Sequence, residues 1–397
     1  MKRLFVLGLI FALLAGCGRA PQPQPQQGTP APPVITLWHS CQGPALAGVE
    51  KAQQELAQTN PSFMLQLVYV PADQFFTRLA QAQAADKGPD LFLVPREKIP
   101  ELFTAGEIQP LNRLFETGAY FPSAVQALSF NGSVMGVPES VTVPILAYNK
   151  DLSPNPPSSL EQMLTQAGKV VKGTTPGLGG DLSDPFLTGG LFKAYGGSFY
   201  TPDQLPSLNS AGSIAFLQGI AALAGIKAGL YDPKASQALL AAGATPFGLL
   251  DSSQLSAYKS LGKNLGYAPI PGPGGKPLQN YVEAKGFVIA ADTGFPKQAA
   301  AAAVFLSSPG VVTLYAPGDY PAVTAAYEQK PLQADSNAQM VKSIAASGAG
   351  YPLDSRTNLL MPFLSQAVKD VLANTDPATA AQNAQNKAYP ALGLKQP

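Results

Sequence analysis

Histidine and cysteine are nearly absent from this chain. Its 397 residues include one histidine, His39, and two cysteines, Cys17 and Cys41. A single histidine excludes the HExxH zinc motif and every metal centre built from several histidines. Two cysteines exclude cysteine-clustered zinc fingers and disulfide-dense scaffolds.

Charged residues are also scarce, at 13% of the chain against roughly 25% in an average soluble protein. Lys and Arg number 26 and Asp and Glu 25, which leaves a net charge of +1. No overall field therefore directs the chain toward nucleic acid or an anionic membrane surface. Hydrophobic residues make up 46%, which is enough for a large core, and the length allows about two to three domains.

The first residues resemble an export signal. A basic start, Met1–Arg3, precedes an uncharged apolar run, Leu4–Ala15, which is shorter than the roughly 20 residues of a transmembrane helix. The run ends in Leu14-Ala15-Gly16-Cys17, which resembles the bacterial lipobox, where the cysteine becomes the first mature residue and carries lipid. We expect a lipoprotein signal peptide over 1–17, with the body exported and anchored to the cell membrane. An ordinary secretory signal with a chance cysteine is the alternative.

Residues 18–33 contain six prolines in 16 positions. Such a segment cannot bury a core, so we expect a polyproline II tether that reaches up to about 50 Å. A disordered segment of no required length is the alternative interpretation. If Cys17 is acylated, Cys41 is the only free thiol, and the mature chain can form no internal disulfide.

Strand and helix patterns alternate from Val34 onward. Apolar strand patterns occupy 34–38, 63–70 and 90–94, and helical spacing occupies 45–59 and 72–85. The first run is continuous, as in a buried parallel strand, and the βαβαβ order predicts an α/β sheet. Ligands of such sheets bind beyond the carboxyl ends of the strands, which selects the loops 38–40 and 95–97.

A second α/β section is expected from about Val143. Its expected helices lie at 159–168, 184–195, 210–229 and 232–241, and further patterns predict strands at 245–250, 266–270 and 286–290 and a helix at 297–306. Gly177–Gly180 lacks the preceding strand and the third glycine of a dinucleotide-binding loop, so we expect a turn there.

Several short motifs follow one another along the body. They are ITLWHS at 35–40, GPDLF at 88–92, LFTAGEIQPL at 102–111, the Asn131–Pro138 stretch, AYNKDL at 147–152, AYGG at 194–197 and GDYPAV at 318–323. In this order they resemble the maltose-binding type of bacterial extracellular solute-binding protein (family 1), the external receptor of an ABC importer. The resemblance covers about residues 34–390.

The resemblance implies an α/β, two-lobed periplasmic-binding-protein fold, whose discontinuous lobes join at a hinge and close on a ligand in the cleft between them. We expect lobe I at 34–140 and 285–320, and lobe II at 141–284 and 321–397. The implied partners are a small solute, expected to be a sugar, and the permease subunits of an importer. We expect a monomer with no cofactor and no metal.

Sugars are bound by aromatic faces and by planar polar side chains that hydrogen-bond their hydroxyls. Trp38, the only tryptophan, ends the first strand, and His39 and Ser40 follow it. The three are candidate ligand contacts; a core tryptophan and a histidine satisfied by backbone groups are the alternatives. By resemblance, charged first-lobe contacts fall at Arg96 and Glu97, which could instead form a surface ion pair.

The resemblance carries over unevenly to the crossing segment and the second lobe. Thr142 stands where the family keeps a carboxylate, and Glu139 lies three residues earlier. Asp184 and Phe186 match the family's acid-Pro-aromatic contact. An Asp followed by a proline is also a favoured start of a helix, with Asp184 as the N-cap. Further candidates are Tyr281 and Glu283 on the returning crossover, and Tyr320.

Two tryptophan platforms of the family are missing here. The first is replaced around 250–253, where Asp251 and Ser253 are candidate contacts, and the second falls near 360–362, which contains no tryptophan. Maltodextrin receptors use these platforms, so we expect a smaller or less stacked ligand, such as a disaccharide or a glycosyl-polyol.

Catalytic motifs are not evident. The sequence has no GxSxG elbow, no Walker loop and no Rossmann fingerprint, and Cys41 with His39 lacks a third group to orient the pair. Glu97, Glu139 and Asp184 could converge as glycosidase carboxylates, but binding explains them equally. We expect a carbohydrate-binding lipoprotein of an ABC importer, and not an enzyme. The alternatives are a receptor-fold protein that binds a protein partner, and a surface glycosidase.

Overall fold

A sheet of seven strands forms the centre of the first half of the molecule. The computed structural model describes residues 31–85, 87–316 and 318–396, so the predictions for Cys17, the signal peptide and most of the tether lie outside the described residues. The spatial strand order is β12 (Tyr320–Pro321), β6 (Gly136–Thr142), β11 (Tyr281–Ile289), β3 (Leu91–Pro95), β1 (Val34–His39) and β2 (Met64–Tyr69), with β13 (Ala349–Gly350) paired to β11.

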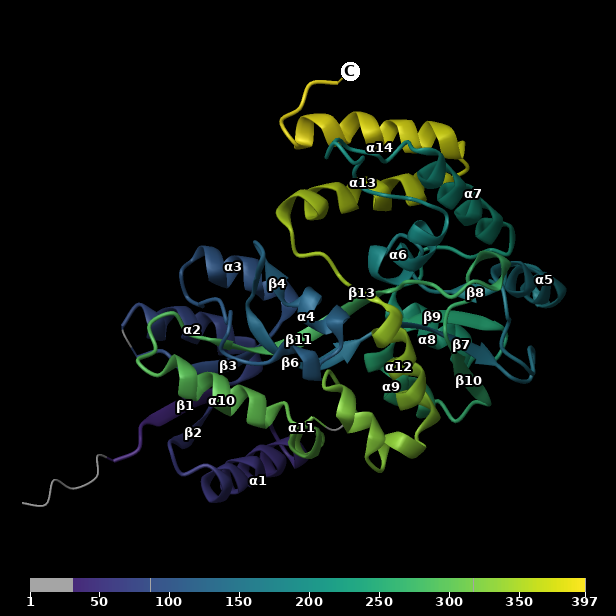
Figure 1. Cartoon of the computed structure of the whole chain (residues 1–397). Coiled ribbons are helices and arrows are strands. Elements are labelled where there is room, and N and C mark those ends of the chain that lie inside the picture. The colour runs from purple at the N-terminus through teal and green to yellow at the C-terminus, as the bar shows by residue number, and fades with distance from the viewer. Residues whose placement is uncertain (1–30, 86, 317, 397) are drawn as a thin grey trace, which may run out of the picture. The chain divides into compact units, whose positions relative to one another are not determined.

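Helices cover this first sheet. They are α1 (Pro44–Thr59), α2 (Phe75–Gln83), α3 (Ile99–Thr104), α4 (Pro122–Ala127), α10 (Pro296–Leu306), α11 (Pro309–Tyr315) and α12 (Ser336–Ser347). Helices α1, α10 and α11 pack against one another, and Figure 1 shows them along one side of the strands. A short hairpin, β4 (Ser129–Phe130) with β5 (Ser133–Val134), precedes β6.

A second sheet has four strands in the order β10 (Leu265–Ala268), β7 (Pro144–Asn149), β9 (Phe247–Asp251) and β8 (Leu178–Gly179). Around it lie α5 (Leu160–Val170), α6 (Pro185–Ala194), α7 (Ala211–Gly225), α8 (Pro233–Ala241), α9 (Leu255–Lys259), α13 (Ser355–Leu372) and α14 (Pro377–Ala391). Helices α13 and α14 pack on each other and on α7, as Figure 1 shows at its top.

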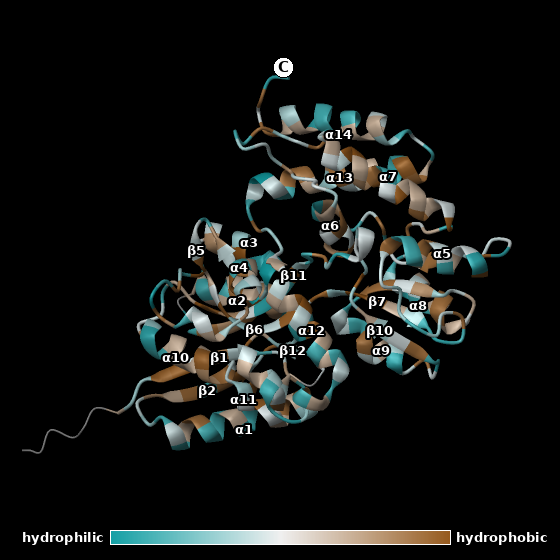
Figure 2. Ribbon diagram, turned by 45° about the vertical axis from the view of Figure 1, so that its right-hand side comes forward, coloured by the Kyte–Doolittle hydropathy of each residue, from teal (hydrophilic) through white to brown (hydrophobic). Residues whose placement is uncertain are grey.

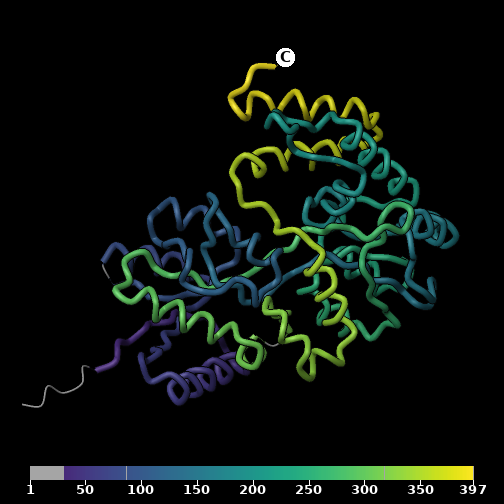
Figure 3. The backbone as a smooth tube through the Cα atoms, viewed as in Figure 1, coloured from purple at the N-terminus to yellow at the C-terminus, as the bar shows by residue number. Residues whose placement is uncertain are grey.

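The chain passes between the two sheets at a few neighbouring points. Strand β6 ends at Thr142 and β7 begins at Pro144, so Val143 alone separates a strand of the first sheet from one of the second. Strand β11 returns beside β6, with Glu283 opposite Thr142, and the tube in Figure 3 follows both passages. A third passage leads from β13 through Tyr351 to α13. Residues far apart in sequence thus meet where the sheets adjoin.

Buried hydrophobic side chains form two clusters. One surrounds the seven-stranded sheet and extends to residues of β7, β9, α8 and α9. The other contains the remaining buried residues of the four-stranded sheet and those of helices α6, α7, α13 and α14. Figure 2 shows the matching hydrophobic colour of the central strands. Residues 322–353 contribute to the first cluster, and residues 360–388 to the second. The change of cluster in the last part of the chain therefore falls after Leu353, and the lobe boundaries given above stay predictions.

Most expected elements are present, with informative differences. Strand β1 pairs in parallel with β2 and β3, but its burial alternates, because Ile35, Leu37 and His39 are buried while Val34 is exposed. The expectation of a uniformly buried strand was wrong. Strand β11 begins at Tyr281, five residues before the predicted start, because pairing with β6 extends it.

The expected turn at Gly177–Gly180 was wrong in part. Leu178 and Gly179 form β8, which pairs in parallel with β9. A two-residue strand has no periodicity to detect, and its partner lies far along the chain. Among the described residues, no single helix is long and apolar enough to cross a membrane; α10 and α11 reach that composition only together, and they bend by 77° at their junction.

Candidate functional site

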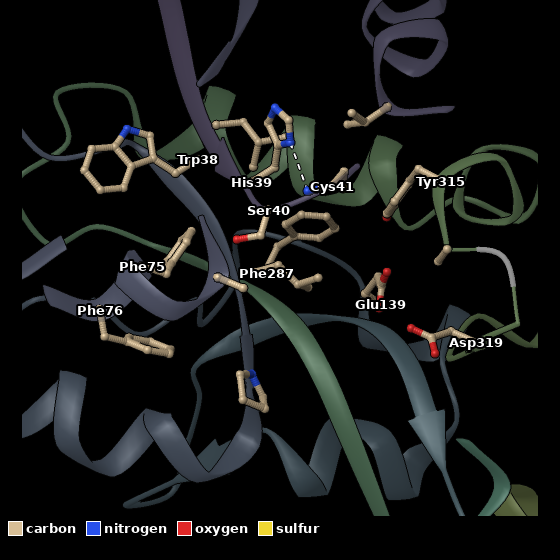
Figure 4. Close-up of a pocket in the computed structure, with 16 residues that line it drawn as sticks. Trp38, His39, Ser40, Cys41, Phe75, Phe76, Glu139, Phe287, Tyr315 and Asp319 are labelled. Atoms are coloured by element: carbon tan, nitrogen blue, oxygen red, sulfur yellow. Dashed lines mark hydrogen bonds between the residues drawn. The ribbon is translucent and has the colours of Figure 1, made fainter. Parts of the chain in front are cut away.

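A cavity of about 330 Å³ lies at the carboxyl ends of β1 and β3, where the sequence placed its first two candidate loops. Trp38, His39 and Ser40 line it, together with Phe75 and Phe76. Figure 4 shows Trp38 and Phe75 on one side of this cavity, and Glu139 and Asp319 on the other. The first-sheet cavity therefore has an aromatic wall and an acidic wall.

Trp38 is half-buried and belongs to the aromatic wall. Its ring meets the Phe75 ring edge to face, with centroids 6.1 Å apart, and it packs on the first hydrophobic cluster. Trp38 therefore packs on the core and also lines the cavity, and its contact with a ligand stays a prediction.

His39 and Ser40 are held by the backbone around them. The Nδ1 atom of His39 accepts from the Cys41 N–H at 3.3 Å, and the Ser40 hydroxyl donates to the Val70 carbonyl at 2.8 Å. Burial lowers the pKa of His39, with Glu50 opposing that shift, so the imidazole is neutral near pH 7. Burial also raises the pKa of the Cys41 thiol. Neither group is an activated nucleophile.

Arg96 joins the first sheet to the third passage of the chain. It follows β3 and is buried, and its Nη1 donates to the carbonyls of Tyr351 at 3.3 Å and Pro352 at 3.0 Å. Its guanidinium lies 3.9 Å from the centroid of the Tyr351 ring, and its Nε lies 3.5 Å from Oε1 of Glu283. Glu97, next in the chain, is exposed and makes no such contact.

Three aromatic rings from distant segments gather beside Arg96. The Tyr351 ring centroid lies 5.0 Å from that of Tyr281 and 5.8 Å from that of Phe186. The Lys193 ammonium lies over the Tyr281 ring, 3.9 Å from its centroid. Burial lowers the pKa of Lys193 to about 8. Gly189 of α6 makes room for this arrangement, because a Cβ there would lie 2.3 Å from Tyr281 Cε2. We call Arg96, Glu283, Tyr281, Phe186 and Tyr351 the crossing cluster.

Burial shifts the pKa values of the polar members of the crossing cluster. Burial raises the pKa of Glu283, and Arg96 opposes that shift. Burial also raises the pKa of Tyr281 to about 12, so both tyrosines stay neutral donors. Thr142 is half-buried and lies opposite Glu283 in the strand pairing.

A smaller cavity of about 150 Å³ lies at the end of β9 and the start of α6. Asp184 and Asp251 line it. Asp184 caps α6, since its Oδ1 accepts from the Phe186 N–H at 2.8 Å, as the Asp-Pro sequence predicted. Burial raises the pKa of Asp184, while that N–H lowers it. Asp251 accepts from the Ser253 N–H at 2.9 Å, and Ser253 itself is exposed.

Glu139 and Tyr320 lie apart from the crossing cluster. Glu139 is 1% exposed and lines the acidic wall of the first-sheet cavity. Nearby, the Lys285 ammonium donates to Asp319 Oδ2 at 2.8 Å. Tyr320 is buried in the first hydrophobic cluster, and burial raises its pKa to about 12. It lines neither cavity described above, whereas its neighbour Asp319 lines the first-sheet cavity.

The structure brings together side chains that the sequence presented separately. Arg96, Glu283, Tyr281 and Phe186 meet through Tyr351, and Asp184 is close enough to influence the pKa values of Tyr351 and Glu283. Sequence reasoning missed Tyr351, Lys193 and the Lys285–Asp319 pair. No local motif marks Tyr351, because its partners lie on three other segments. Among the described residues, no three His, Cys, Asp or Glu side chains gather to hold a metal ion.

Comparisons with known proteins agree with this architecture. A cyclo/maltodextrin-binding protein, solved with maltotetraose, superposes with a TM-score of 0.80 at 20% identity, over 91% of this chain and 98% of that one. A maltose-binding periplasmic protein from Listeria monocytogenes, solved with maltose, gives 0.78 at 16% identity, over 92% and 99%. The chain therefore has the two-lobed α/β fold of periplasmic binding proteins.

Sequence relatives define the family. The model of the bacterial extracellular solute-binding protein family matches residues 51–340. A maltotriose-binding protein from Pyrococcus abyssi is 21% identical over 247 residues, which are 60% of this chain and 53% of that protein, so the match spans about half of the relative's length. The chain belongs to the bacterial extracellular solute-binding proteins.

Proposed function

We propose that this chain is the carbohydrate-binding subunit of an ABC importer, exported and held to the membrane by lipid on Cys17. Family membership supports solute capture, and the names of its relatives support a sugar. The observation that carries the proposal is the crossing cluster. It places a buried arginine, a carboxylate and three aromatic rings at the point where the two sheets adjoin.

These groups suit a sugar chemically. Aromatic rings offer flat faces to the CH side of a pyranose, while Arg96, Glu283 and the tyrosine hydroxyls are hydrogen-bonding groups for its hydroxyls. Because the two tryptophan platforms of the family are missing, at 250–253 and 360–362, a disaccharide or glycosyl-polyol is the favoured ligand class.

Capture follows from differential affinity. Arg96 directly follows β3 of the first sheet, and Asp184 and Phe186 lie at the start of a helix beside the second. A ligand that contacts both sets favours the closed arrangement of the lobes over the open one, and it shifts the equilibrium by that difference in affinity. The closed, loaded form then docks on the permease and releases the sugar.

A binding screen tests the proposal. The purified chain would be heated with maltose, maltotriose, trehalose, glucosylglycerol and simple polyols, and hits would be measured by calorimetry. A ligand at 100 times its dissociation constant should add about 2.7 kcal/mol to the free energy of unfolding. Arg96→Ala should abolish the shift for the true ligand, while Glu116→Gln, at an exposed position, should retain it.

Two results would contradict the proposal. If no carbohydrate or polyol binds, a receptor fold that now binds a protein partner becomes the better reading. If a bound glycoside is recovered as hydrolysis products, the chain is a glycosidase. We expect the ligand to be recovered intact, as a binding protein requires.

A further inference from the structure

Glu139 occupies an irregular position in the strand that joins the two sheets. Lys285 of β11 pairs with Ser140 and the next residue, Gly286, pairs with Pro138, so Glu139 is the extra residue of a β-bulge. Bulges redirect side chains next to functional sites. Here the side chain is 1% exposed and lines the first-sheet cavity. Among the residues described, its Oε2 has no hydrogen-bond partner.

Three donors near Glu139 are engaged elsewhere, and the Ser140 hydroxyl, whose hydrogen bond lowers the pKa of Glu139, leaves its Oε2 without a partner. The Tyr315 hydroxyl donates to the Leu306 carbonyl at 3.1 Å, and the Ser40 hydroxyl donates to Val70. The Lys285 ammonium pairs with Asp319 at 2.8 Å. A buried carboxyl oxygen without a donor costs free energy, so this arrangement calls for a donor from outside the protein.

The remainder of the cavity wall is largely apolar. Trp38, Phe75, Phe76, Leu93 and Phe287 contribute to it, and Figure 4 shows Phe287 between the aromatic and the acidic sides. The volume is about 330 Å³. An apolar cavity of about 150 Å³ already accepts benzene, so a substituted six-membered ring fits in this space.

We propose that this cavity receives an apolar ring of the ligand that carries one hydrogen-bond donor, an ammonium or a hydroxyl, and that Glu139 accepts that donor. The inference rests on the proposed function in one respect: it treats the cavity as the first-lobe part of the ligand site. It adds a ligand class, because a ring with one apolar face and a single donor differs from a fully hydroxylated sugar.

The protonation of Glu139 distinguishes the two donors. Burial raises the pKa of Glu139 to about 7; Ser140 and Lys285 oppose that shift, and Asp319 adds to it. Cys41 and Tyr315 also influence its titration, and His39 lines the same cavity. An ammonium favours the carboxylate, so its binding near pH 7 releases the Glu139 proton to solvent. A hydroxyl binds without that release.

Three cyclohexane probes test the inference on the full chain without carbohydrate. They are cyclohexylmethylamine, cyclohexylmethanol and the methyl ether of that alcohol, which has no donor. Binding is followed by the emission of Trp38, the only tryptophan, and by calorimetry in two buffers of different ionisation heat. We expect one site per chain, and at least one donor probe that binds about tenfold or more tightly than the ether.

Variants assign the effect to Glu139. Glu139→Leu should remove the advantage of the donor probes, and Glu139→Gln should remove that of the amine while it largely keeps that of the alcohol, because the amide oxygen still accepts. Glu116→Gln, an exposed control, should change nothing. Proton release with the amine alone identifies an ammonium site.

Equal affinity for all three probes, absence of binding, or an unchanged preference in Glu139→Leu would overturn the inference. The carbohydrate screen is independent of it. If a sugar binds while these probes neither bind nor compete, the inference fails and the proposed function stands. If the probes bind with the expected preference and no carbohydrate does, the reverse holds.

Discussion

The Arg96 guanidinium stacks on the ring of Tyr351, 3.9 Å from its centroid, across 255 positions of sequence. The same arginine donates to the Tyr351 and Pro352 carbonyls, so ring and backbone are held together. Arg96 follows a strand of the first sheet, while Tyr351 leads into α13, which packs in the second cluster. This contact therefore ties Arg96 to a segment that connects the two sheets.

Loss of the Tyr351 ring should weaken this tie. We expect Tyr351→Leu to lower the free energy of unfolding by about 1–2 kcal/mol, because it removes the cation–π contact and the aromatic neighbours of Tyr281 and Phe186. Tyr351→Phe keeps the ring and should change stability by less than about 0.5 kcal/mol. Urea unfolding measures both. Equal losses in the two variants would assign the effect to the hydroxyl.

Substitution of Asp184 should distinguish helix capping from ligand binding. Asn caps helices nearly as well as Asp, so Asp184→Asn should keep its stability within about 0.5 kcal/mol. If the carboxylate also contacts the ligand, affinity should fall about tenfold, or about 1.4 kcal/mol. Asp376→Asn, at the cap of α14, is the matched control and should leave affinity unchanged. Unchanged calorimetric affinity in Asp184→Asn would leave capping as its whole role.

Glu139 should make stability depend on pH. Its pKa is about 7 in the folded chain against an ordinary 4.5, so the folded chain binds the proton more tightly than the unfolded chain. The stabilisation is complete below about pH 4.5 and is lost as pH rises through about 7, by up to roughly 3 kcal/mol.

Glu139→Gln should remove that contribution. The difference in unfolding free energy between wild type and variant, measured by urea titration from pH 4.5 to 8, should shift in favour of the variant up to about pH 7 and then level off. Glu116→Gln is again the control. A difference that stays constant over this range would show that Glu139 titrates normally.

Trp38 should report ligand binding. It lines the first-sheet cavity and is half-buried, so a ligand in that cavity should shift its emission to the blue or change its intensity, saturating at one ligand per chain. Trp38→Phe should retain the fold and bind more weakly. Should tight binding leave the emission unmoved, and Trp38→Ala cost about 3–5 kcal/mol of stability, the residue serves the core alone.

Cys17 should carry the anchor. With Cys17→Ser the chain should be exported without acylation, and a fatty-acid probe should no longer label it in cells. Acyl chains contribute about 0.8 kcal/mol per buried methylene, so their loss should release the protein from membranes. Equal labelling of both forms would contradict the lipobox interpretation.

Local signals of the sequence were sufficient for most of the elements. Helix α6 begins at Pro185, with Asp184 as its N-cap, as the sequence predicts. This start could be predicted because an Asp cap and a proline at the first helical position depend only on neighbouring residues. Strand β1, by contrast, looked uniformly buried in sequence and alternates in the structure. The burial of a strand depends on what covers each face of its sheet, which no local pattern states.

The candidate site, too, could be predicted from the sequence only in part. Arg96, Tyr281, Glu283 and Phe186 could be selected from the sequence, since each lies at an element end or matches a family motif. Their assembly could not, because Tyr351, which touches three of them, carries no motif of its own.

The sequence alone determined the α/β class, most of the order of strands and helices, and the residue types available for a ligand, since these follow from periodicity, caps and composition. Tertiary structure decided which of those side chains meet. The bulge that turns Glu139 into a buried cavity, and the stacking of Arg96 on Tyr351, depend on strand register and on pairing between segments far apart in the chain. Such pairing is set by the packing of the whole fold, and no short stretch of sequence specifies it.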